Sequence, residues 1–329
     1  MKKRKYIVLI ALSVVMLTGC KITETKSELS DYYLSMTNSS RINENEISVE
    51  NHIYDFENDK MDTENYKMNL TAKYSLAVYD DKGKSVLYSA KDANGNDEVY
   101  RYDLKTKKSE QLTNNLWGVN YIVPREKDYI VVGVPQVPRD SKVLMLWSID
   151  RNTKEVQNIE IPHNKYNDIS VWQVAYVPET DGLILQTYSD SETYELQDKW
   201  NSMEEHPKDK EFTNPFYYYQ YVNGKMKYLF EKDMPQSMGI VANKKDILFA
   251  VQSEVKGNDV FRYNIKDNKV YKVKELETLE KTFYLDEESE NVYRFNGKIG
   301  KINLETGKEE WLDSNFKESY FNNYMLLKK

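Results

Sequence analysis

Residues 95–104 read GNDEVYRYDL and residues 257–265 read GNDVFRYNI, so one pattern occurs twice in the chain. In each stretch a Gly-Asn-Asp turn leads into residues that alternate in polarity, which is typical of a strand with one buried face. A polar turn follows at 105–107 and at 266–268, and a further strand begins after it. The two stretches therefore predict a repeated β-hairpin.

The hairpin recurs at regular intervals. Its turn is found six times, and one residue in each turn marks the position: Asp59, Thr106, Asn152, Asn223, Asn268 and Thr306. Successive markers are 47, 46, 71, 45 and 38 residues apart. Apart from the long interval, this spacing is close to a four-stranded propeller blade of about 40–45 residues. A parallel β-helix has shorter rungs, and a β-sandwich does not repeat at this period.

Two more strands precede the hairpin in five of the six repeats, for example at 119–123 and 129–134. The first repeat lacks its inner strand, because only about residues 47–66 are available to form the strands of the first blade. Residues 320–327, YFNNYMLL, read as a strand that no hairpin follows. We expect this strand to pair with the N-terminal strands, because closing the ring removes an exposed sheet edge. The sequence thus predicts an all-β, six-bladed β-propeller over residues 46–329.

Residues 86–113, VLYSAKDANGNDEVYRYDLKTKKSEQLT, resemble the repeat of TolB-type (WD40-like) propellers. In that repeat a strand ends in Ser, an Asp-x-x-Gly-Asn turn follows, and a Tyr-x-x-Asp strand and a closing Leu-Thr complete it. The match is close over this blade and partial over residues 246–273. The resemblance implies the propeller fold. Such repeats occur in periplasmic scaffold proteins, in the non-catalytic domains of peptidases and in surface lipoproteins.

Residues 1–19 predict a lipoprotein signal peptide. Four basic residues at 2–5 precede an apolar run at 6–16, which is too short for a permanent span of about 20 residues. Leu17-Thr18-Gly19-Cys20 follows and resembles the bacterial lipobox, which implies diacylglyceryl transfer to the Cys20 thiol and cleavage before it. Cys20 is the only cysteine of the chain. We expect this lipid to anchor the protein on the extracytoplasmic face of the cell membrane. The alternative is an ordinary secretory signal with a chance cysteine.

Residues 20–45 are polar and lack periodicity, so we expect a flexible tether between the lipid and the propeller. Processing would leave 46 − 4 = 42 basic residues against 53 acidic ones, a net charge of −11. Nucleic acids and anionic lipid headgroups require basic patches. The charge therefore argues against nucleic acid as a partner, and the expected contact with the membrane is the lipid anchor.

Signals for catalysis are sparse. The chain has three histidines, and it contains no His-Glu-x-x-His, Gly-x-Ser-x-Gly or phosphate-binding glycine motif. Asp92, Asn94, Asn96 and Asp97 offer oxygen ligands of the kind that calcium prefers. Their glycine falls too early for an EF-hand, and the same residue types form tight turns between strands. Calcium binding and a plain turn are both open, and no other cofactor is expected.

The long interval between turns contains an insertion at about 189–215, between the second and third strands of its blade. Residues 191–206 read as a helix with Ser191 as its N-cap. Connections of this kind share one face of a propeller with the loops between blades, and long loops in compact domains are often functional. We therefore expect ligand-binding residues on this face, at Trp117, His163, Tyr166, Asp168 and Trp200, where aromatic and polar groups suit peptide or glycan recognition. Packing between blades is the alternative role for each.

These features together predict a lipid-anchored, non-enzymatic binding or scaffold module for a protein, a peptide or an envelope glycan. Two alternatives remain open. One is a metal-dependent hydrolase or lactonase-like enzyme with calcium in the central channel. The other is an accessory or sensor lipoprotein of a transporter.

Overall fold

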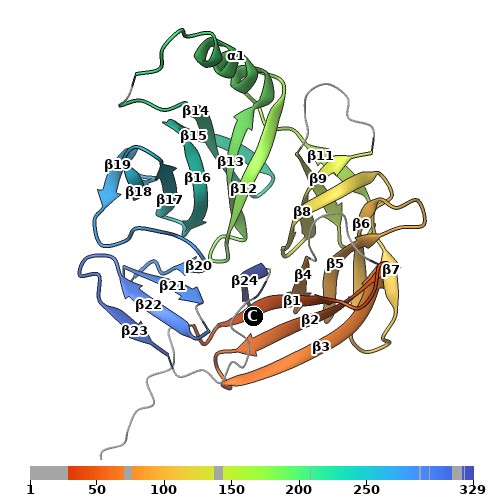
Figure 1. Cartoon of the computed structure of the whole chain (residues 1–329). Helices are drawn as coiled ribbons and strands as arrows, with labels where there is room; N and C mark the ends of the chain where they lie inside the picture. The colour runs from red at the N-terminus through yellow and green to blue at the C-terminus, as the bar shows by residue number, and fades with distance from the viewer. Residues whose placement is uncertain are drawn as a thin grey trace, which may run out of the picture.

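The computed structural model describes residues 29–69, 76–136, 144–207, 209–288, 290–295, 297–312, 321 and 323–329. Within these residues, 24 strands form six four-stranded antiparallel sheets. The sheets stand side by side around a central axis, as the blades of a ring (Figure 1). The predicted six-bladed β-propeller is confirmed. Cys20 and the signal peptide lie outside the described residues.

We number the blades I to VI along the chain and give each from its innermost strand outward. Blade I contains β24 (Asn323–Lys328), β1 (Tyr32–Arg41), β2 (Glu46–Asp55) and β3 (Lys60–Asn69). Blade II contains β4 (Ala77–Asp80), β5 (Ser85–Lys91), β6 (Asp97–Asp103) and β7 (Ser109–Gln111). Blade III contains β8 (Leu116–Pro124), β9 (Asp128–Pro135), β10 (Met145–Asp150) and β11 (Val156–Ile159).

The other three blades follow the same plan. Blade IV contains β12 (Ile169–Val177), β13 (Gly182–Ser189), β14 (Asn214–Val222) and β15 (Lys225–Met234), with helix α1 (Asp190–Asn201) between β13 and β14. Blade V contains β16 (Gln236–Ala242), β17 (Asp246–Ser253), β18 (Gly257–Asn264) and β19 (Lys269–Val273). Blade VI contains β20 (Thr282–Leu285), β21 (Asn291–Phe295), β22 (Ile299–Asn303) and β23 (Glu309–Trp311).

The ends of the chain meet in blade I and close the ring. Strand β24 pairs antiparallel with β1, from Tyr32 opposite Lys328 to Thr37 opposite Asn323. Leu326 is buried in one core cluster, with Leu34 of β1 among its members. Leu327 is buried in a second cluster, which extends into blades II and III. The predicted closure by the C-terminal strand is confirmed, and it joins two hydrophobic clusters.

The predicted tether over residues 20–45 is wrong where the structure describes it, because Tyr32–Arg41 form strand β1. The polar residues of this strand resemble a linker but are buried and hydrogen-bonded. Ser35 Oγ accepts a hydrogen bond from the Tyr79 amide at 3.0 Å, and Thr37 Oγ1 donates to the Ala77 carbonyl at 2.6 Å. Both bonds join blade I to blade II. The propeller therefore begins before residue 46.

The six repeated turns share a backbone conformation. Each outer hairpin contains at least one residue in the left-handed region: Asp59 (φ 47°), Lys107 (φ 56°), Lys154 (φ 62°), Asn223 (φ 53°) with Gly224 (φ 72°), Asn268 (φ 52°) and Gly307 (φ 67°). Asn, Asp and Gly tolerate this region best, which explains their frequency in these turns. The turn chemistry is therefore the basis of the periodicity in the sequence.

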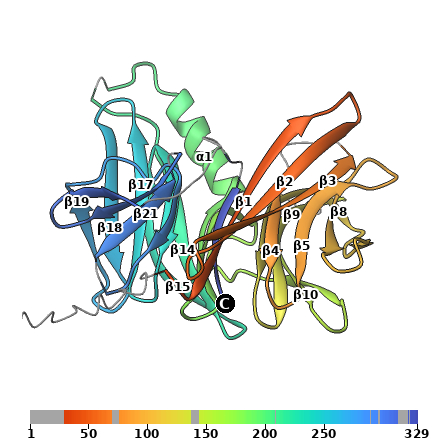
Figure 2. The same ribbon diagram turned by 90° about the horizontal axis from the view of Figure 1, so that it is seen from below.

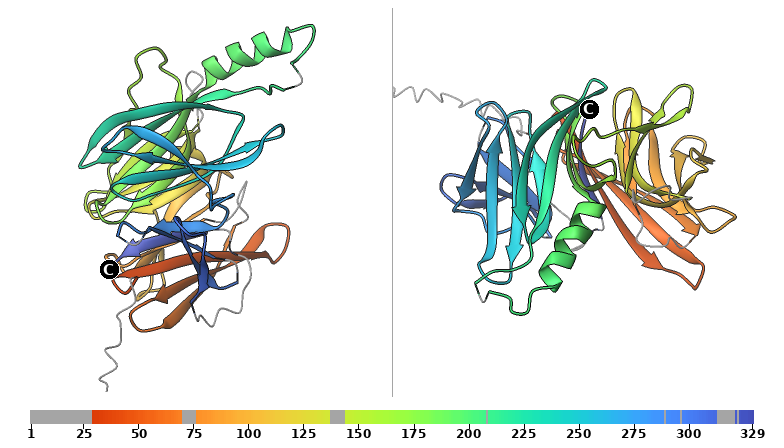
Figure 3. Two further views of the ribbon diagram at one scale, coloured as in Figure 1. Left: turned by 90° about the vertical axis from the view of Figure 1, so that its left-hand side faces the viewer. Right: turned by 90° about the horizontal axis from the view of Figure 1, so that it is seen from above.

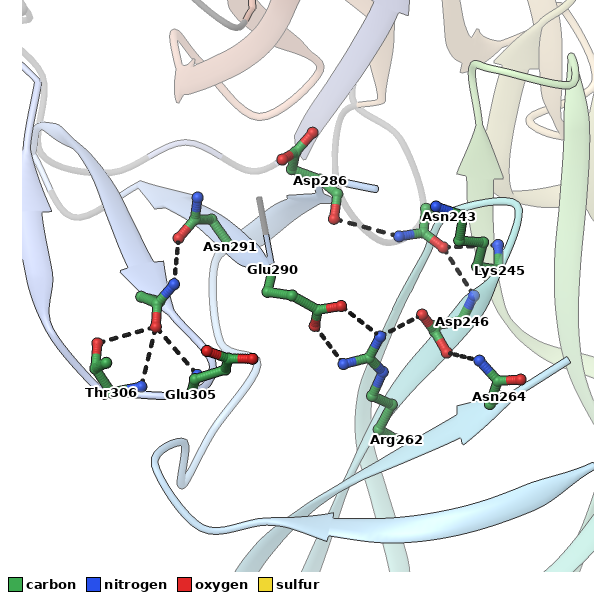
Figure 4. A network of polar contacts seen from close by, with 11 residues as sticks. Asn243, Lys245, Asp246, Arg262, Asn264, Asp286, Glu290, Asn291, Glu305 and Thr306 are labelled. Carbon is green, nitrogen blue, oxygen red and sulfur yellow. Dashed lines mark hydrogen bonds and ion pairs between the residues drawn. The ribbon is translucent and has the colours of Figure 1, made fainter. Parts of the chain in front are cut away.

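Neighbouring blades are joined by apolar packing and by charged contacts at their edges. Between blades V and VI, Arg262 of β18 donates to Asp246 of its own blade at 2.5 Å and to Glu290 of the next blade at 2.9 Å (Figure 4). Asn243 donates from Nδ2 to the Asp286 carbonyl at 3.4 Å in the same network. Such contacts orient one blade against the next.

The ring has two different ends. Helix α1 lies at one end, beside the loops between blades, and the C-terminus lies at the other (Figures 2 and 3). None of the residues of α1 is buried, so the helix adds surface to the ring and no core. Among the described residues there is no helix with the length and apolar character needed to cross a membrane.

Candidate functional site

The start of helix α1 is fixed by two side chains from blade IV. Ser189 Oγ accepts a hydrogen bond from the Glu192 amide at 3.1 Å, as an N-cap does, and donates to Asp168 Oδ1 at 2.7 Å. Asp168 Oδ2 accepts from the Ser191 amide at 2.6 Å. These bonds satisfy amides that the first turn leaves unpaired. The cap is therefore Ser189, two residues before the predicted cap Ser191, and the helix begins at Asp190.

The helix also ends earlier than residue 206. It stops at Asn201, where the Ser202 amide donates to the Asp198 carbonyl at 3.0 Å and Ser202 Oγ donates to the Lys199 carbonyl at 2.9 Å. These local bonds end the helix well before Pro207. The predicted site residue Trp200 stacks on His206, with ring centroids 4.6 Å apart, and so holds the returning chain against the helix.

The cap of α1 places Glu192 over the outer strands of blade IV. Its Oε1 accepts a hydrogen bond from the Tyr166 hydroxyl at 2.9 Å, and its Oε2 accepts one from the Tyr217 hydroxyl. Tyr166 belongs to the loop between blades III and IV, and Tyr217 belongs to β14. The Lys165 ammonium lies 3.8 Å from the same carboxylate. Helix, loop and blade are thus joined at one acidic group.

His163 completes this corner. Its ring stacks on Tyr166 with centroids 5.5 Å apart and an interplanar angle of 17°, and it lies 4.5 Å from the ring of Tyr217. Its Nδ1 accepts a hydrogen bond from the Tyr166 amide at 3.0 Å. A ring nitrogen that accepts in this way carries no proton, so the contact favours one tautomer. The predicted residues His163 and Tyr166 therefore lie together.

These groups border a groove of about 620 Å³ between α1, the loop and the outer strands of blade IV. Tyr217 and Tyr219 form its buried floor, and Tyr228 stands at its edge with 46% of its surface exposed. Glu231 and Asp233 of β15 also line it, both exposed to solvent. With Glu192, the lining contains three carboxylates and one lysine. The groove is aromatic and net acidic.

Tyr217 and Tyr228 of the groove keep their hydroxyl protons, because their surroundings raise the pKa of each phenol. Burial, followed by the hydrogen bond and charge of Glu192, raises the pKa of Tyr217. Burial, together with the nearby Glu231, raises the pKa of Tyr228 to about 12. A phenol beside a carboxylate resists ionisation because a second negative charge would be repelled. At neutral pH these two tyrosines are therefore uncharged and can donate hydrogen bonds.

Trp117 does not line the groove but belongs to a feature that repeats around the ring. It occupies a β-bulge near the start of β8, the innermost strand of blade III, and 53% of its surface is exposed. The innermost strands of the next three blades are bulged at the corresponding place, at Trp172, Met238 and Phe283. Trp172 and Met238 are exposed as well. A bulge re-aims a side chain, so large apolar residues recur at the α1 end of the inner strands.

The residues considered for calcium form a turn. Asp92 Oδ1 accepts from the amides of Asn94 and Asn96, each at 2.9 Å, and Oδ2 accepts from Asn94 Nδ2 at 3.2 Å. Burial alone would raise the pKa of Asp92, but these hydrogen bonds lower it below its usual value. Asp97 is buried at the start of β6. In the part of the chain that the structure describes, no three His, Cys, Asp or Glu residues group as ligands for a metal.

Of the five predicted binding residues, the groove brings together His163 and Tyr166, while Asp168 positions the helix, and Trp200 and Trp117 lie elsewhere. The groove residues that the prediction missed include Glu192, Tyr217, Tyr219, Tyr228, Glu231 and Asp233. One signal was available in the sequence. Residues 217–219 are three consecutive tyrosines, and alternation along a strand places the first and third on one face.

Comparison with known proteins supports the fold. No family model matches the sequence, and no curated protein does. TolB from Acinetobacter baumannii has a similar structure, with a TM-score of 0.51 and 14% identity, over 92% of this chain and 68% of that one. An uncharacterised protein from Listeria monocytogenes EGD-e gives a TM-score of 0.50 and 11% identity, over 86% and 79%. The propeller domain of the Trilobed protease from Pyrococcus furiosus gives 0.46 and 16%, over 85% and 84%. The chain therefore shares a β-propeller fold with TolB.

Proposed function

We propose that this protein is a binding module, anchored by lipid on Cys20 outside the cytoplasmic membrane, whose groove beside α1 binds a cationic segment of a protein or peptide. The observation that carries the proposal is the composition of the groove, whose lining contains three carboxylates, four tyrosines and only one lysine. Lys and Arg side chains combine a charge with an apolar stem. Carboxylates pair with the charge, and tyrosine rings pack against the stem and attract the cation.

The charge of the whole chain supports the same class of ligand. The processed protein would carry a net charge of −11, which attracts cationic partners over distance and raises the rate of encounter. The exposed Trp117, Trp172 and Met238 at the same end of the ring add apolar contact area. Aromatic residues of this kind often dominate the energy of protein interfaces. A segment with alternating basic and apolar residues would therefore suit this end of the propeller.

Neutralising two carboxylates at the edge of the groove is expected to weaken binding of a cationic peptide about tenfold at low salt. The variant is Glu231→Gln with Asp233→Asn, and the probe is a fluorescent peptide of alternating Lys and Leu, followed by anisotropy. Raising the salt concentration should reduce the difference between the variant and the unmodified protein, because exposed charges are screened.

The matched control removes two negative charges elsewhere, with Glu277→Gln and Glu305→Gln. Both residues are exposed and lie outside the groove. We expect this control to retain most of the affinity. If the groove variant and the control variant weaken binding equally, the peptide responds only to the total charge of the protein. Binding of an envelope glycan without binding of the peptide would contradict the proposed ligand class.

The anchor is tested separately. Changing Cys20→Ala is expected to move the protein from the membrane fraction to the soluble fraction, or to leave it unprocessed, because two acyl chains anchor stably and their absence removes that affinity. Fractionation of cells after labelling with a radioactive fatty acid measures this. Membrane retention with label on another residue would contradict the proposed anchor.

A further inference from the structure

A second cavity is lined by the C-terminal residues Leu327, Lys328 and Lys329. The C-terminus lies at the end of the ring opposite helix α1 (Figure 2). The volume of the cavity is about 910 Å³, larger than that of the groove. It is lined by the turns that join the first and second strands of blades II, III and IV, by the end of β24, and by Arg151, Asn223 and Gly224 of the outer hairpins of blades III and IV. We call this cavity the channel mouth, because the innermost strands that surround the axis of the ring end beside it.

Most charged groups at this mouth are already paired. Asp80 accepts two hydrogen bonds from Arg151, each at 2.8 Å. Asp181 accepts from the Glu126 amide and from the Tyr176 hydroxyl, each at 3.0 Å. The Arg151–Asp80 and Glu126–Asp181 bonds join neighbouring blades, and the Tyr176–Asp181 bond lies within blade IV, so these contacts have an evident structural role. Two buried atoms, one on a basic and one on an acidic side chain, have no hydrogen-bond partner among the described residues.

The first is a nitrogen of Arg125, in the turn between β8 and β9. The residue is 7% exposed; its Nε donates to Asp128 Oδ1 at 2.9 Å, and its guanidinium lies 5.0 Å from the centre of the Tyr221 ring. Its Nη1 is buried and has no hydrogen-bond partner within the described residues. A guanidinium has five N–H donors, and this one has donors left for a ligand.

The second is an oxygen of Glu179, in the turn between β12 and β13. Its Oε1 accepts from the Tyr284 hydroxyl at 2.9 Å. Tyr284 belongs to blade VI, which is not adjacent to blade IV, so this bond places the carboxylate in the channel mouth. Its Oε2 is buried and finds no partner among the residues that the structure describes. Burial also raises the pKa of this carboxyl group, and a bound cation would favour its charged form.

We infer that the channel mouth binds a small zwitterion, a free amino acid or a short peptide, whose carboxylate pairs with Arg125 and whose ammonium group pairs with Glu179. A buried donor or acceptor without a partner is costly. An anion alone would leave Glu179 Oε2 without a partner, and a cation alone would leave Arg125 Nη1 without one. A ligand with both charges satisfies both residues, which lie in adjacent blades and line one cavity.

The test uses the purified full chain and a defined panel of the twenty amino acids and the dipeptides Ala-Xaa and Xaa-Ala at millimolar concentration. Thermal shift identifies the best binder, and calorimetry compares it with its N-acetylated and C-amidated forms. We expect either modification to weaken binding about tenfold or more. No thermal shift with any member of the panel, or equal affinity of the free and modified forms, would overturn the inference.

Two variants assign the contacts. Glu179→Gln keeps an acceptor for Tyr284 and removes the charge, so it should weaken the free ligand about tenfold and abolish the difference between free and N-acetylated forms. Arg125→Lys keeps the positive charge but lacks the planar fork of arginine, so it should reduce the difference in affinity between the free and C-amidated forms. Unchanged affinity in Glu179→Gln would contradict the inference even if Arg125→Lys fails to fold. Binding of the Lys/Leu peptide at the other end should be unaffected by Glu179→Gln, so the two sites can fail independently.

Discussion

Removal of residues 323–329 is expected to unfold the whole propeller and not one blade alone. The deletion removes β24, and with it the six backbone pairs to β1 and the buried side chains of Leu326 and Leu327. Truncating one buried leucine costs about 2–5 kcal/mol. Losing both leucines therefore removes a large part of the roughly 5–15 kcal/mol that keeps a domain folded. It also exposes β1 as an open edge that promotes aggregation. Thermal unfolding followed by circular dichroism measures the effect.

A larger deletion at the other end of the ring serves as the control. Replacing residues 191–206 with a Gly-Ser linker removes most of α1, which has no buried residue. We expect this variant to unfold cooperatively near the temperature of the unmodified chain, although it loses the wall of the groove. A truncated chain without residues 323–329 that melts as the full chain does would show that closure contributes little. Recovery of folding when a peptide of residues 321–329 is added to the truncated chain would support ring closure by the C-terminal strand.

Changing Arg151→Met is expected to lower the free energy of unfolding by about 3–5 kcal/mol, because it leaves a buried carboxylate without its partner. The side chain of Asp80 is 1% exposed, and Arg151 donates to both of its oxygens across the boundary between blades II and III. The guanidinium also lies 4.5 Å from the Tyr129 ring, and its Nε donates to the Arg125 carbonyl at 2.6 Å. Urea unfolding monitored by fluorescence gives the change.

The control is an exposed ion pair between the same two blades, II and III. Lys154 pairs with Glu110, and their side chains are 45% and 37% exposed. Changing Lys154→Met should cost less than about 1 kcal/mol, because water screens an exposed pair and solvates the group left behind. A similar decrease in the free energy of unfolding for Arg151→Met and Lys154→Met would show that the buried Asp80–Arg151 pair stabilises the contact between the blades no more than an exposed pair does.

The architecture was predictable because its signal is local and repeated. Turn residues such as Asn223 and Gly307 adopt the left-handed backbone region, and few other residue types do so easily, so the turns recur visibly in the sequence. Strand β1 was missed for the opposite reason. Its Ser35 and Thr37 are polar but make buried hydrogen bonds to blade II. Composition cannot distinguish such residues from a linker, because their partners lie some 40 positions away.

The sites were less predictable than the fold. The insertion and the face that carries it follow from the interval between turns, and His163 and Tyr166 do lie together there. Glu231 and Tyr228, however, reach the groove only because β15 pairs with β14 in one register, and a bulge near Tyr219 shifts that register. At the other end, Arg125 and Glu179 occupy turns of a kind that usually points into solvent. Their burial depends on the assembled ring.

Both sites require the two ends of the chain to meet in one blade, and a disulfide cross-link measures this directly. Ser35 of β1 lies opposite Met325 of β24, and paired residues of antiparallel strands are about 4.5–5.5 Å apart at Cα, within the range of a disulfide. In a Cys20→Ser background, which has no other cysteine, Ser35→Cys with Met325→Cys should oxidise to a single intramolecular bond. Ser35→Cys with Tyr324→Cys should not, because adjacent positions of a strand face opposite sides. No cross-link in the first variant, or equal cross-linking in both, would contradict a ring closed by the C-terminal strand.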